Sequence, residues 1–266
     1  MIYKEIYKEG VQRLKDHGVR EAELDARLLL EYVCKTDRNT LLAHPEREVS
    51  DEETTAYNAC IKRREAREPL QYITGEQEFM GLWFLVGTDT LIPRQDTECL
   101  VEEAMKSLHD GMDILDLCCG TGTVSLALAR RGYELVSVDA SAEMLSVFQQ
   151  KLFDLPEGTV APMLLCQRAE ELDLYDTVDG ALCCLDSMNY LPPTLLYAVL
   201  KKVHLFLSPG GAFCFDFLSP EHLRSLDGEC FVDEQEDTLC LWRASVEGEE
   251  LRYGMRTYSG VERRFD

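Results

Sequence analysis

The sequence lacks the features that would place it in a membrane, at a metal ion or around disulfides. It has no run of about 18 apolar residues, so no membrane-spanning helix is predicted. The first residues, Met1 to Glu5, include no apolar signal segment. The 11 cysteines include no Cys-x-x-Cys pair, and the 5 histidines are scattered along the chain. We therefore expect a reduced, cytoplasmic protein with no metal site and no membrane partner.

Basic residues are also few. The chain has 27 Lys and Arg against 49 Asp and Glu, which gives a net charge of −22. Residues 1–75 carry 13 of the basic and 15 of the acidic side chains, so residues 76–266 carry 14 and 34. A phosphate backbone would be repelled by this acidic excess. The composition therefore argues against a nucleic-acid partner.

A strand, a turn of small residues and a helix are predicted between residues 112 and 129. The apolar run 112–117 predicts a buried strand, and Val124 to Ala129 predicts a helix start. The turn between them consists of Cys118, Cys119, Gly120, Thr121 and Gly122. A second apolar run ends at Asp139, about 17 residues later. Parallel sheets seat nucleotide-like cofactors at such a turn, and a carboxylate on the second strand accepts the ribose hydroxyls.

The residues around this turn separate the possible ligands. A dinucleotide fingerprint wants Gly or Ala where Ser125 stands, and a phosphate loop wants Gly-Lys-Ser/Thr, which is absent. Asp116, just before the turn, would repel a pyrophosphate but suits the positively charged methionine part of S-adenosyl-L-methionine (SAM). The turn resembles motif I of class I SAM-dependent methyltransferases, with Cys118 where the first glycine is usual. A turn that serves packing alone is the alternative.

The second half of the chain continues as alternating strands and helices. A third strand at residues 163–166 is followed by Gln167, Arg168, Ala169 and Glu170, which would flank the adenine. A fourth strand at 178–185 ends in a loop of Asp186, Ser187, Met188, Asn189 and Tyr190. A fifth strand is expected at 212–217, and residues 238–246 and 251–258 predict an antiparallel hairpin. The predicted class is α/β, with a doubly wound, Rossmann-like sheet and a C-terminal hairpin.

Residues 1 to about 67 have helical apolar spacing. Ser50, followed by Glu53, is a capping-box start. The basic cluster at residues 62–67 ends that helix, where it complements the helix dipole or, as the alternative, docks a partner. Thr97 is predicted to cap a helix over residues 98–108.

The linking segment carries a more specific resemblance. Residues 68–75 (EPLQYITG), 91–98 (LIPRQDTE) and 21–29 (EAELDARLL) resemble the release-factor glutamine methyltransferase (HemK-like) family, over roughly residues 10–110. The resemblance implies a helical domain at 1–74 that docks a protein substrate. It also implies a hairpin linker at 75–92 and a SAM-binding domain at 93–266. Pro93 and Arg94 would then lie near the active cleft, and the protein substrate would be a peptide chain release factor.

The fourth-strand loop departs from that family, which carries Asn-Pro-Pro-Tyr there to hold the substrate amide. Here the loop, residues 186–190, resembles that of a broad group of small class I methyltransferases. The expected function is SAM-dependent N-methylation of a protein. Asp186 would lie at the methyl group and accept an N–H of the acceptor, Asn189 would assist, and Tyr190 would wall the pocket. The alternatives are a small-molecule acceptor, a non-catalytic SAM-binding or partner-binding protein, or a loop in which Asn189 and Tyr190 only cap the next helix.

Overall fold

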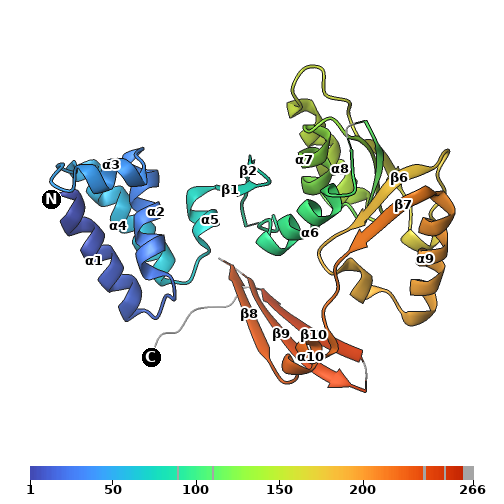
Figure 1. The fold of residues 1–266 in the computed structure, drawn as a ribbon. Helices are drawn as coiled ribbons and strands as arrows, with labels where there is room; N and C mark the ends of the chain where they lie inside the picture. The colour runs from blue at the N-terminus through green and yellow to red at the C-terminus, as the bar shows by residue number, and fades with distance from the viewer. Residues whose placement is uncertain (89, 110, 236–237, 249, 260–266) are drawn as a thin grey trace. The chain divides into compact units, whose positions relative to one another are not determined.

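The computed structural model describes residues 1–88, 90–109, 111–235, 238–248 and 250–259. The chain divides into two compact units, residues 1–98 and 99–266, and each is described by itself (Figure 1). The first unit is helical and includes a two-stranded hairpin, and the second holds a five-stranded sheet and a separate three-stranded sheet. The predicted α/β class with a helical N-terminal part is therefore confirmed.

Helices and one hairpin build the first unit. Its elements are α1 (Tyr3–Asp16), α2 (Ala22–Cys34), α3 (Arg38–Ala43), α4 (Asp51–Glu65), α5 (Leu70–Thr74), β1 (Glu76–Phe79) and β2 (Leu82–Leu85). The predicted capping box starts α4: the Glu53 N–H donates to Ser50 Oγ at 3.1 Å, and the Ser50 N–H donates to Glu53 Oε2 at 2.8 Å. The domain boundaries at residues 74 and 92 stay predictions.

Buried apolar side chains from α1, α2 and α4 form the core of this unit. Leu14, Leu29 and Ile61 are fully buried, and each such side chain stabilises the fold by about 2 kcal/mol. The Tyr57 hydroxyl donates to the Ala26 carbonyl at 3.1 Å and leaves no room for a side chain at Gly10, where a Cβ would lie 2.1 Å from it. A glycine in the middle of α1 therefore lets Tyr57 enter the core.

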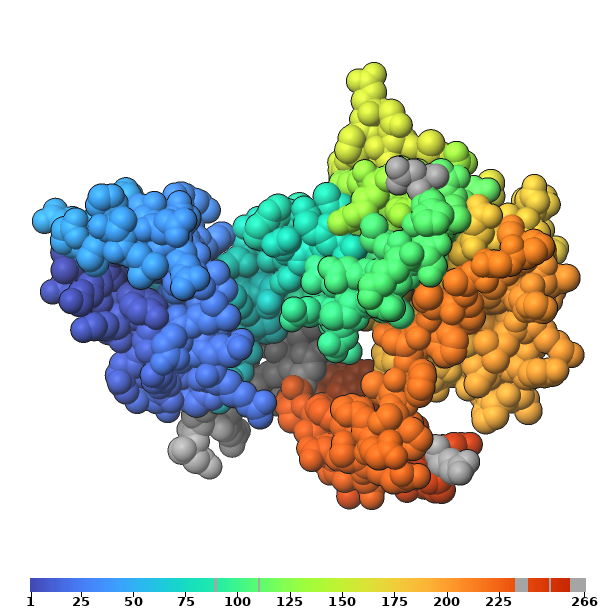
Figure 2. Space-filling view, viewed as in Figure 1, coloured from blue at the N-terminus to red at the C-terminus, as the bar shows by residue number. Residues whose placement is uncertain are grey.

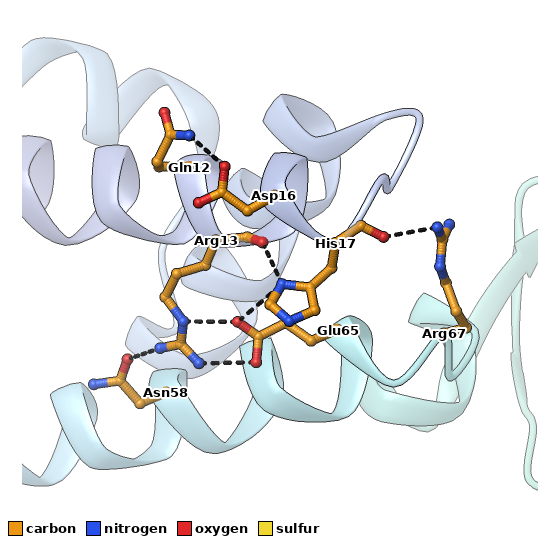
Figure 3. Close-up of polar contacts among 7 residues, drawn as sticks. All are labelled: Gln12, Arg13, Asp16, His17, Asn58, Glu65 and Arg67. Carbon is orange, nitrogen blue, oxygen red and sulfur yellow. Dashed lines mark hydrogen bonds and ion pairs between the residues drawn. The ribbon is translucent and has the colours of Figure 1, made fainter.

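Ion pairs join the helices of this unit. Arg13 on α1 donates to both carboxylate oxygens of Glu65 on α4, at 2.8 and 3.1 Å, and to Asn58 Oδ1 at 2.8 Å (Figure 3). The Arg67 guanidinium donates to the His17 carbonyl at 2.7 Å. These contacts hold the start of the chain against α4 and the segment that follows it.

The basic cluster at residues 62–67 has internal partners. Arg64 donates to Asp25 Oδ2 at 2.7 Å, and Asp25 is only 5% exposed. Arg63 donates to Glu68 and to the Tyr72 carbonyl. With Arg67 bonded to His17, three of the cluster's cations tie α4 to its neighbours. The cluster therefore also joins α4 to the rest of this unit. Lys62, Arg63 and Arg64 lie in the last turn of α4, where the predicted dipole role places them, and docking of a partner stays a prediction.

The helix α6 (Gln95–Met105) starts earlier than predicted. Thr97 is 3% exposed and lies inside α6, so the prediction that it caps a helix starting at Glu98 is wrong. Thr97, Val101 and Ala104 are all buried, and their spacing of four and three residues puts them on one helix face. Burial of that face explains why the helix extends toward its N-terminus.

The second unit is built around a parallel sheet. Its strands are β3 (Asp113–Leu117), β4 (Glu134–Asp139), β5 (Met163–Cys166), β6 (Val178–Cys183) and β7 (Leu207–Phe215), in the order β5-β4-β3-β6-β7. The helical segments between them are α7 (Thr123–Ala129), α8 (Ala142–Lys151), η1 (Leu152–Asp154), η2 (Ala169–Glu171), η3 (Ser187–Tyr190) and α9 (Pro193–Phe206). Figure 1 shows α7 and α8 on one side of this sheet and α9 on the other. The doubly wound arrangement is confirmed.

Strand order places the carboxyl ends of β3, β4 and β6 side by side. Strand β3 pairs in parallel with β4 on one side and β6 on the other, so the chain reverses its direction of travel across the sheet at β3. Ligands of open α/β sheets bind in the crevice at such a point. Leu115 and Leu117 of β3 are fully buried and pack in one cluster with Val199 and Val203 of α9. This packing holds β3, whose carboxyl end leads into the glycine turn, in place against α9.

One difference from the prediction concerns the start of β7. Strand β7 starts at Leu207 rather than Ala212, and its pairing with β6 shifts at Gly180. Residues 208–211, which precede the predicted strand, are therefore an irregular part of β7. The segment after α8, yellow-green in Figure 2, stands out from the surface of this unit and exposes Phe153.

The predicted C-terminal hairpin is present and gains a third strand. After the short helix α10 (Pro220–Ser225), β8 (Cys230–Gln235), β9 (Thr238–Glu247) and β10 (Glu250–Ser259) form an antiparallel sheet in the order β10-β9-β8. This sheet is separate from the parallel one. No helix within the described ranges is long and apolar enough to cross a membrane.

Candidate active site

The glycine turn follows β3 and contains three residues with left-handed backbones. The φ angles are +62° at Cys118, +55° at Gly120 and +81° at Gly122. Glycine takes such angles without the steric cost that a Cβ brings. Cys118 therefore has a backbone conformation that glycine adopts more easily than cysteine. This agrees with the glycine that is usual at this position of motif I.

The two glycines of the turn face different surroundings. A Cβ on Gly122 would lie 2.3 Å from the Phe148 ring, so this glycine permits close packing of α8 against the turn. A Cβ on Gly120 would meet nothing within 4 Å. The turn is thus closed on the side of α8 and open at Gly120, where a ligand can approach the backbone.

Asp139 joins the ends of β3 and β4. Its Oδ2 accepts from the Gly120 N–H and its Oδ1 accepts from the Ser141 N–H, both at 2.8 Å. The Cys119 N–H also donates to the Val138 carbonyl, at 3.1 Å. Asp139 is half-buried, and each carboxylate oxygen has a further lone pair. The carboxylate is thereby fixed against the turn and still able to accept from a ribose hydroxyl.

Sequence reasoning missed the support that α8 gives to the turn. Lys151 donates from Nζ to the Thr121 carbonyl at 3.1 Å and to Thr121 Oγ1 at 2.9 Å. Phe148 is fully buried beneath Gly122. Burial lowers the pKa of Lys151. No sequence signal links Lys151 to Thr121, because they are 30 residues apart and belong to different elements.

Asp116 is enclosed rather than exposed to a ligand. It is 2% exposed, and its Oδ2 accepts from Ser125 Oγ of α7 at 2.5 Å. Ser125 Oγ also bonds Ser137 Oγ of β4 at 2.7 Å. Burial raises the pKa of Asp116 to about 6. The structure therefore places Asp116 in the layer between β3, β4 and α7, where it ties these elements together; its contact with the cofactor's ammonium stays a prediction.

Thiols gather where β3 and β6 end. The Cys183 thiol donates to the Cys118 sulfur, which lowers the pKa of Cys118 and raises that of Cys183. Burial raises the pKa of Cys119 and of Cys184. The Cys118–Cys183 contact links the glycine turn to the strand that precedes the acceptor loop.

The residues predicted to flank the adenine pair with each other. The Arg168 guanidinium donates to Glu170 Oε1 at 2.6 Å, and Ala169 is buried between them in η2. Hydrogen bonding at its own backbone and to Arg168 lowers the pKa of Glu170. Gln167, the first residue of the predicted adenine segment, follows β5 directly and donates its backbone N–H to the Asp139 carbonyl at 3.1 Å. These four residues begin where the neighbouring strand β5 ends.

The loop of residues 186–190 follows β6, beside the glycine turn on the neighbouring strand. Asp186 has a φ of +48° and starts the single turn η3, in which Met188 is buried and Tyr190 is 74% exposed. Ser187 Oγ donates to the Cys184 carbonyl at 2.8 Å. Asn189 Oδ1 accepts from the Leu218 N–H, and α9 is preceded by Pro192 with no side-chain cap. Asn189 and Tyr190 therefore do not cap α9.

Two predicted site residues belong to the first unit. Pro93 and Arg94 immediately precede α6, and the Arg94 carbonyl accepts from the Thr97 and Glu98 N–H groups. Their place near the active cleft stays a prediction.

Among the residues that the structure describes, no group of three or more His, Cys, Asp or Glu side chains could hold a metal ion.

The comparison with known proteins follows this division of the chain. Residues 5–75 match the family described as PrmC N-terminal domain, and residues 114–211 match the family described as methyltransferase domain. A release factor glutamine methyltransferase of Caulobacter vibrioides is 31% identical over 227 residues, which cover 80% of this chain and 76% of that protein. The chain belongs to the release factor glutamine methyltransferase family.

Other members of the release factor glutamine methyltransferase family match a shorter part. The Escherichia coli protein is 38% identical over 153 residues, 56% of this chain and 54% of its own length. The Aliivibrio fischeri protein is 45% identical over 125 residues, 47% of this chain and 44% of its own length. The chain thus matches only about half the length of these two relatives.

Solved structures resemble the catalytic unit. A SAM-dependent methyltransferase from Clostridium acetobutylicum has a TM-score of 0.50 and 27% identity, covering 62% of this chain and 74% of that one. The CcbJ methyltransferase from Streptomyces caelestis, at 20% identity, has a TM-score of 0.50 over 64% and 74% of the two chains, which shows the fold alone. As a member of the release factor glutamine methyltransferase family, the protein is a SAM-dependent methyltransferase, and the predicted enzyme class and cofactor are confirmed.

Proposed function

We propose that this enzyme methylates a nitrogen atom of a protein, and that the side-chain amide of a glutamine in a peptide release factor is its acceptor. The observation that carries this proposal is the match to the Caulobacter vibrioides relative across both units of the chain. The first unit supports it, because residues 5–75 of its 98 residues match the PrmC N-terminal domain family. We assign this unit, residues 1–74 with the linker 75–92, to docking of the protein acceptor.

The glycine turn fits SAM. A ligand can approach the backbone of Gly120, because no atom lies within 4 Å of the place of a Cβ there. The Asp139 carboxylate is held by the Gly120 N–H and has lone pairs that can accept further hydrogen bonds. The carboxyl ends of β3, β4 and β6 are neighbours in the sheet. We assign the ribose to Asp139, the methionine part to residues 118–122, and the adenine to residues 167–170. When bound, SAM would supply a methyl group on a positively charged sulfur: the nitrogen–carbon bond would form in line as the carbon–sulfur bond breaks, the neutral thioether would leave, and the nitrogen would release one proton.

The chain's own task is alignment. A nucleophile that is held in line with the methyl group needs no strong base, because positioning alone supplies a large part of the rate. We assign Asp186 to accept an N–H of the acceptor, which points the nitrogen lone pair away from it. Asn189 is tied to Leu218 and so keeps the loop in place, and the exposed Tyr190 forms a wall beside it.

A second candidate acceptor is a small molecule with an amine nitrogen. The observation that favours it is the loop itself, which has Asp-Ser-Met-Asn-Tyr where the glutamine methyltransferases have Asn-Pro-Pro-Tyr. A carboxylate at Asp186 attracts a positively charged amine more strongly than a neutral amide.

One assay separates these candidates. Purified enzyme is given SAM with a labelled methyl group, together with release factor or, separately, with an extract of small metabolites. Label on a release-factor glutamine supports the proposal, label on a metabolite supports the second candidate, and no label on either would reject both acceptors. Asp186→Ala should abolish turnover and leave SAM affinity, measured by calorimetry, within about threefold. Equal loss of turnover and of affinity would reject the acceptor role of Asp186.

We also propose that the enzyme works in the cytoplasm. The support is that all 11 cysteines are free in the structure, including the adjacent Cys118 and Cys183, which is typical of a reducing compartment. A search for disulfides by mass spectrometry on protein taken from cells under alkylating conditions tests this assignment.

A further inference from the structure

The tip of β6 has an unusual backbone. Leu185 and Asp186 are consecutive and neither is glycine, yet their φ angles are +60° and +48°. A residue with a side chain avoids this left-handed region, so two in succession persist only when their surroundings hold them there. These residues lead directly into the acceptor loop, and their backbone angles set the direction in which the Asp186 side chain leaves the chain.

The loop after β7 holds them. Asp216 directly follows β7, and its Oδ1 accepts from the Asp186 N–H at 2.8 Å. In the opposite sense, Asn189 Oδ1 accepts from the Leu218 N–H at 2.9 Å. Each loop thus offers a side-chain acceptor to a backbone N–H of the other. The two bonds lie at either end of η3 and fasten the acceptor loop at both ends.

Asp216 is itself held in place. Strands β6 and β7 are neighbours, with Cys183 opposite Phe215, so Asp216 stands beside the residues that follow β6. The rings of Phe215 and Phe217, the two neighbours of Asp216 in the chain, have centroids 6.3 Å apart, and Phe215 also contacts Phe213 at 5.0 Å. Asp216 is half-buried. A carboxylate anchored in this way can fix the backbone that it bonds.

We propose that Asp216 is a positioning residue for methyl transfer: its carboxylate holds the Asp186 N–H, and through it the left-handed turn that aims the Asp186 side chain at the acceptor nitrogen. This inference rests on the proposed function, in which Asp186 accepts an N–H of the acceptor. It predicts that Asp216 acts through hydrogen-bond geometry rather than through its charge.

Three variants test the proposal. Asp216→Ala removes the acceptor, whereas Asp216→Asn keeps an oxygen at the same place and removes the charge. Asp227→Ala is the matched control, because Asp227 Oδ1 also accepts from a backbone N–H at 2.8 Å, that of Val246 in the C-terminal sheet. The readouts are kcat and KM for methyl transfer, SAM affinity by calorimetry, thermal unfolding, and hydrogen exchange at the Asp186 amide by NMR.

Asp216→Ala should lower kcat by about a hundredfold, since a misplacement of about 1 Å has that effect. SAM affinity should stay within about twofold, and exchange at the Asp186 amide should become roughly tenfold faster. Asp216→Asn should restore kcat to within about threefold of the wild-type value and restore the slow exchange. Asp227→Ala should leave kcat unchanged even where its unfolding temperature falls as much as that of Asp216→Ala.

Several results would overturn the proposal. A kcat of Asp216→Ala equal to wild type would remove the positioning role, and an Asp216→Asn variant as inactive as Asp216→Ala would show that charge is what matters. Equal losses of kcat in Asp227→Ala and Asp216→Ala would show a general loss of stability. The exchange measurement needs no acceptor, so it separates the two proposals. If release factor is not methylated, the proposed function fails. Unchanged exchange at the Asp186 amide in Asp216→Ala would still reject the holding role of Asp216, and faster exchange that Asp216→Asn reverses would still support it.

Discussion

At the scale of single residues, the two glycines of the turn do different work. Gly120 has open space where a Cβ would stand, and Gly122 has the Phe148 ring there at 2.3 Å. Both have positive φ angles, so alanine at either place is strained by about 1–2 kcal/mol. The two positions therefore differ in the space around the added methyl group. Alanine at Gly122 should mainly affect stability, and alanine at Gly120 should mainly affect cofactor binding.

We predict that the two alanine variants affect different properties. Gly122→Ala should add an overpacking cost of about 1–3 kcal/mol and lower the unfolding temperature markedly. Gly120→Ala should unfold only slightly earlier but bind SAM at least tenfold more weakly, because its methyl group fills the space open to the cofactor. Calorimetric titration and thermal unfolding of both variants check this. Equal SAM affinity in Gly120→Ala and wild type would show that the cofactor does not approach the turn there.

Asp116 makes stability depend on pH. Its pKa is raised from 3.8 to about 6 by burial, so between these values the folded state binds more protons than the unfolded state. Stability from this group is fully present below about pH 4 and is lost as pH rises through about 6. Asp116→Asn should remove this loss and still accept from Ser125. We expect the difference in unfolding temperature between the variant and wild type, without cofactor, to shift in favour of the variant between pH 4 and 6; parallel curves would contradict it.

At the scale of elements, sequence pattern identified most of the framework, although β6 ends at Cys183 rather than Leu185 and β7 starts at Leu207 rather than Ala212. The runs that end at Leu117 and Asp139 are mostly apolar, so the strand–turn–helix order and the position of Asp139 could be predicted. Thr97 misled, because a threonine before a helical pattern resembles a cap and only packing shows that it belongs to the buried face. The partners of Asp186 and Thr121 were not predictable, since Asp216 and Lys151 lie 30 residues away in the chain.

The basic end of α4 gives a test at this scale. Arg64 pairs with the buried Asp25, whereas Lys62 in the same helical turn is exposed. Arg64→Met should leave the Asp25 charge unpaired and lower the free energy of unfolding by about 3 kcal/mol. Lys62→Met, the matched control, should change it by less than about 0.5 kcal/mol. Denaturant unfolding checks both values. If Lys62→Met instead raised KM for the protein acceptor, the cluster would be a docking surface after all.

At the scale of the whole molecule, the unequal charge is the main electrostatic feature. The chain has 49 acidic and 27 basic side chains, and most of the acidic excess lies beyond residue 75. Repulsion between these carboxylates lowers the stability of the folded state. Several ion pairs in the described ranges are exposed on both sides, and such pairs contribute only about 0–1 kcal/mol each. Long-range repulsion should therefore outweigh local attraction in the response to salt.

We predict that salt stabilises this protein. The screening length falls from about 30 Å at 0.01 M to about 8 Å at 0.15 M salt, which weakens repulsion between distant carboxylates more than it weakens contact pairs. The unfolding temperature at pH 7.5 should rise by several degrees over that range of sodium chloride. An equal osmolality of sucrose controls for exclusion from the protein surface, and Lys106→Glu, which makes an exposed site more acidic, should steepen the rise. A temperature that falls with salt would mean that ion pairs such as Arg13–Glu65 and Arg64–Asp25 dominate, and that the acidic excess has little influence on the folded state.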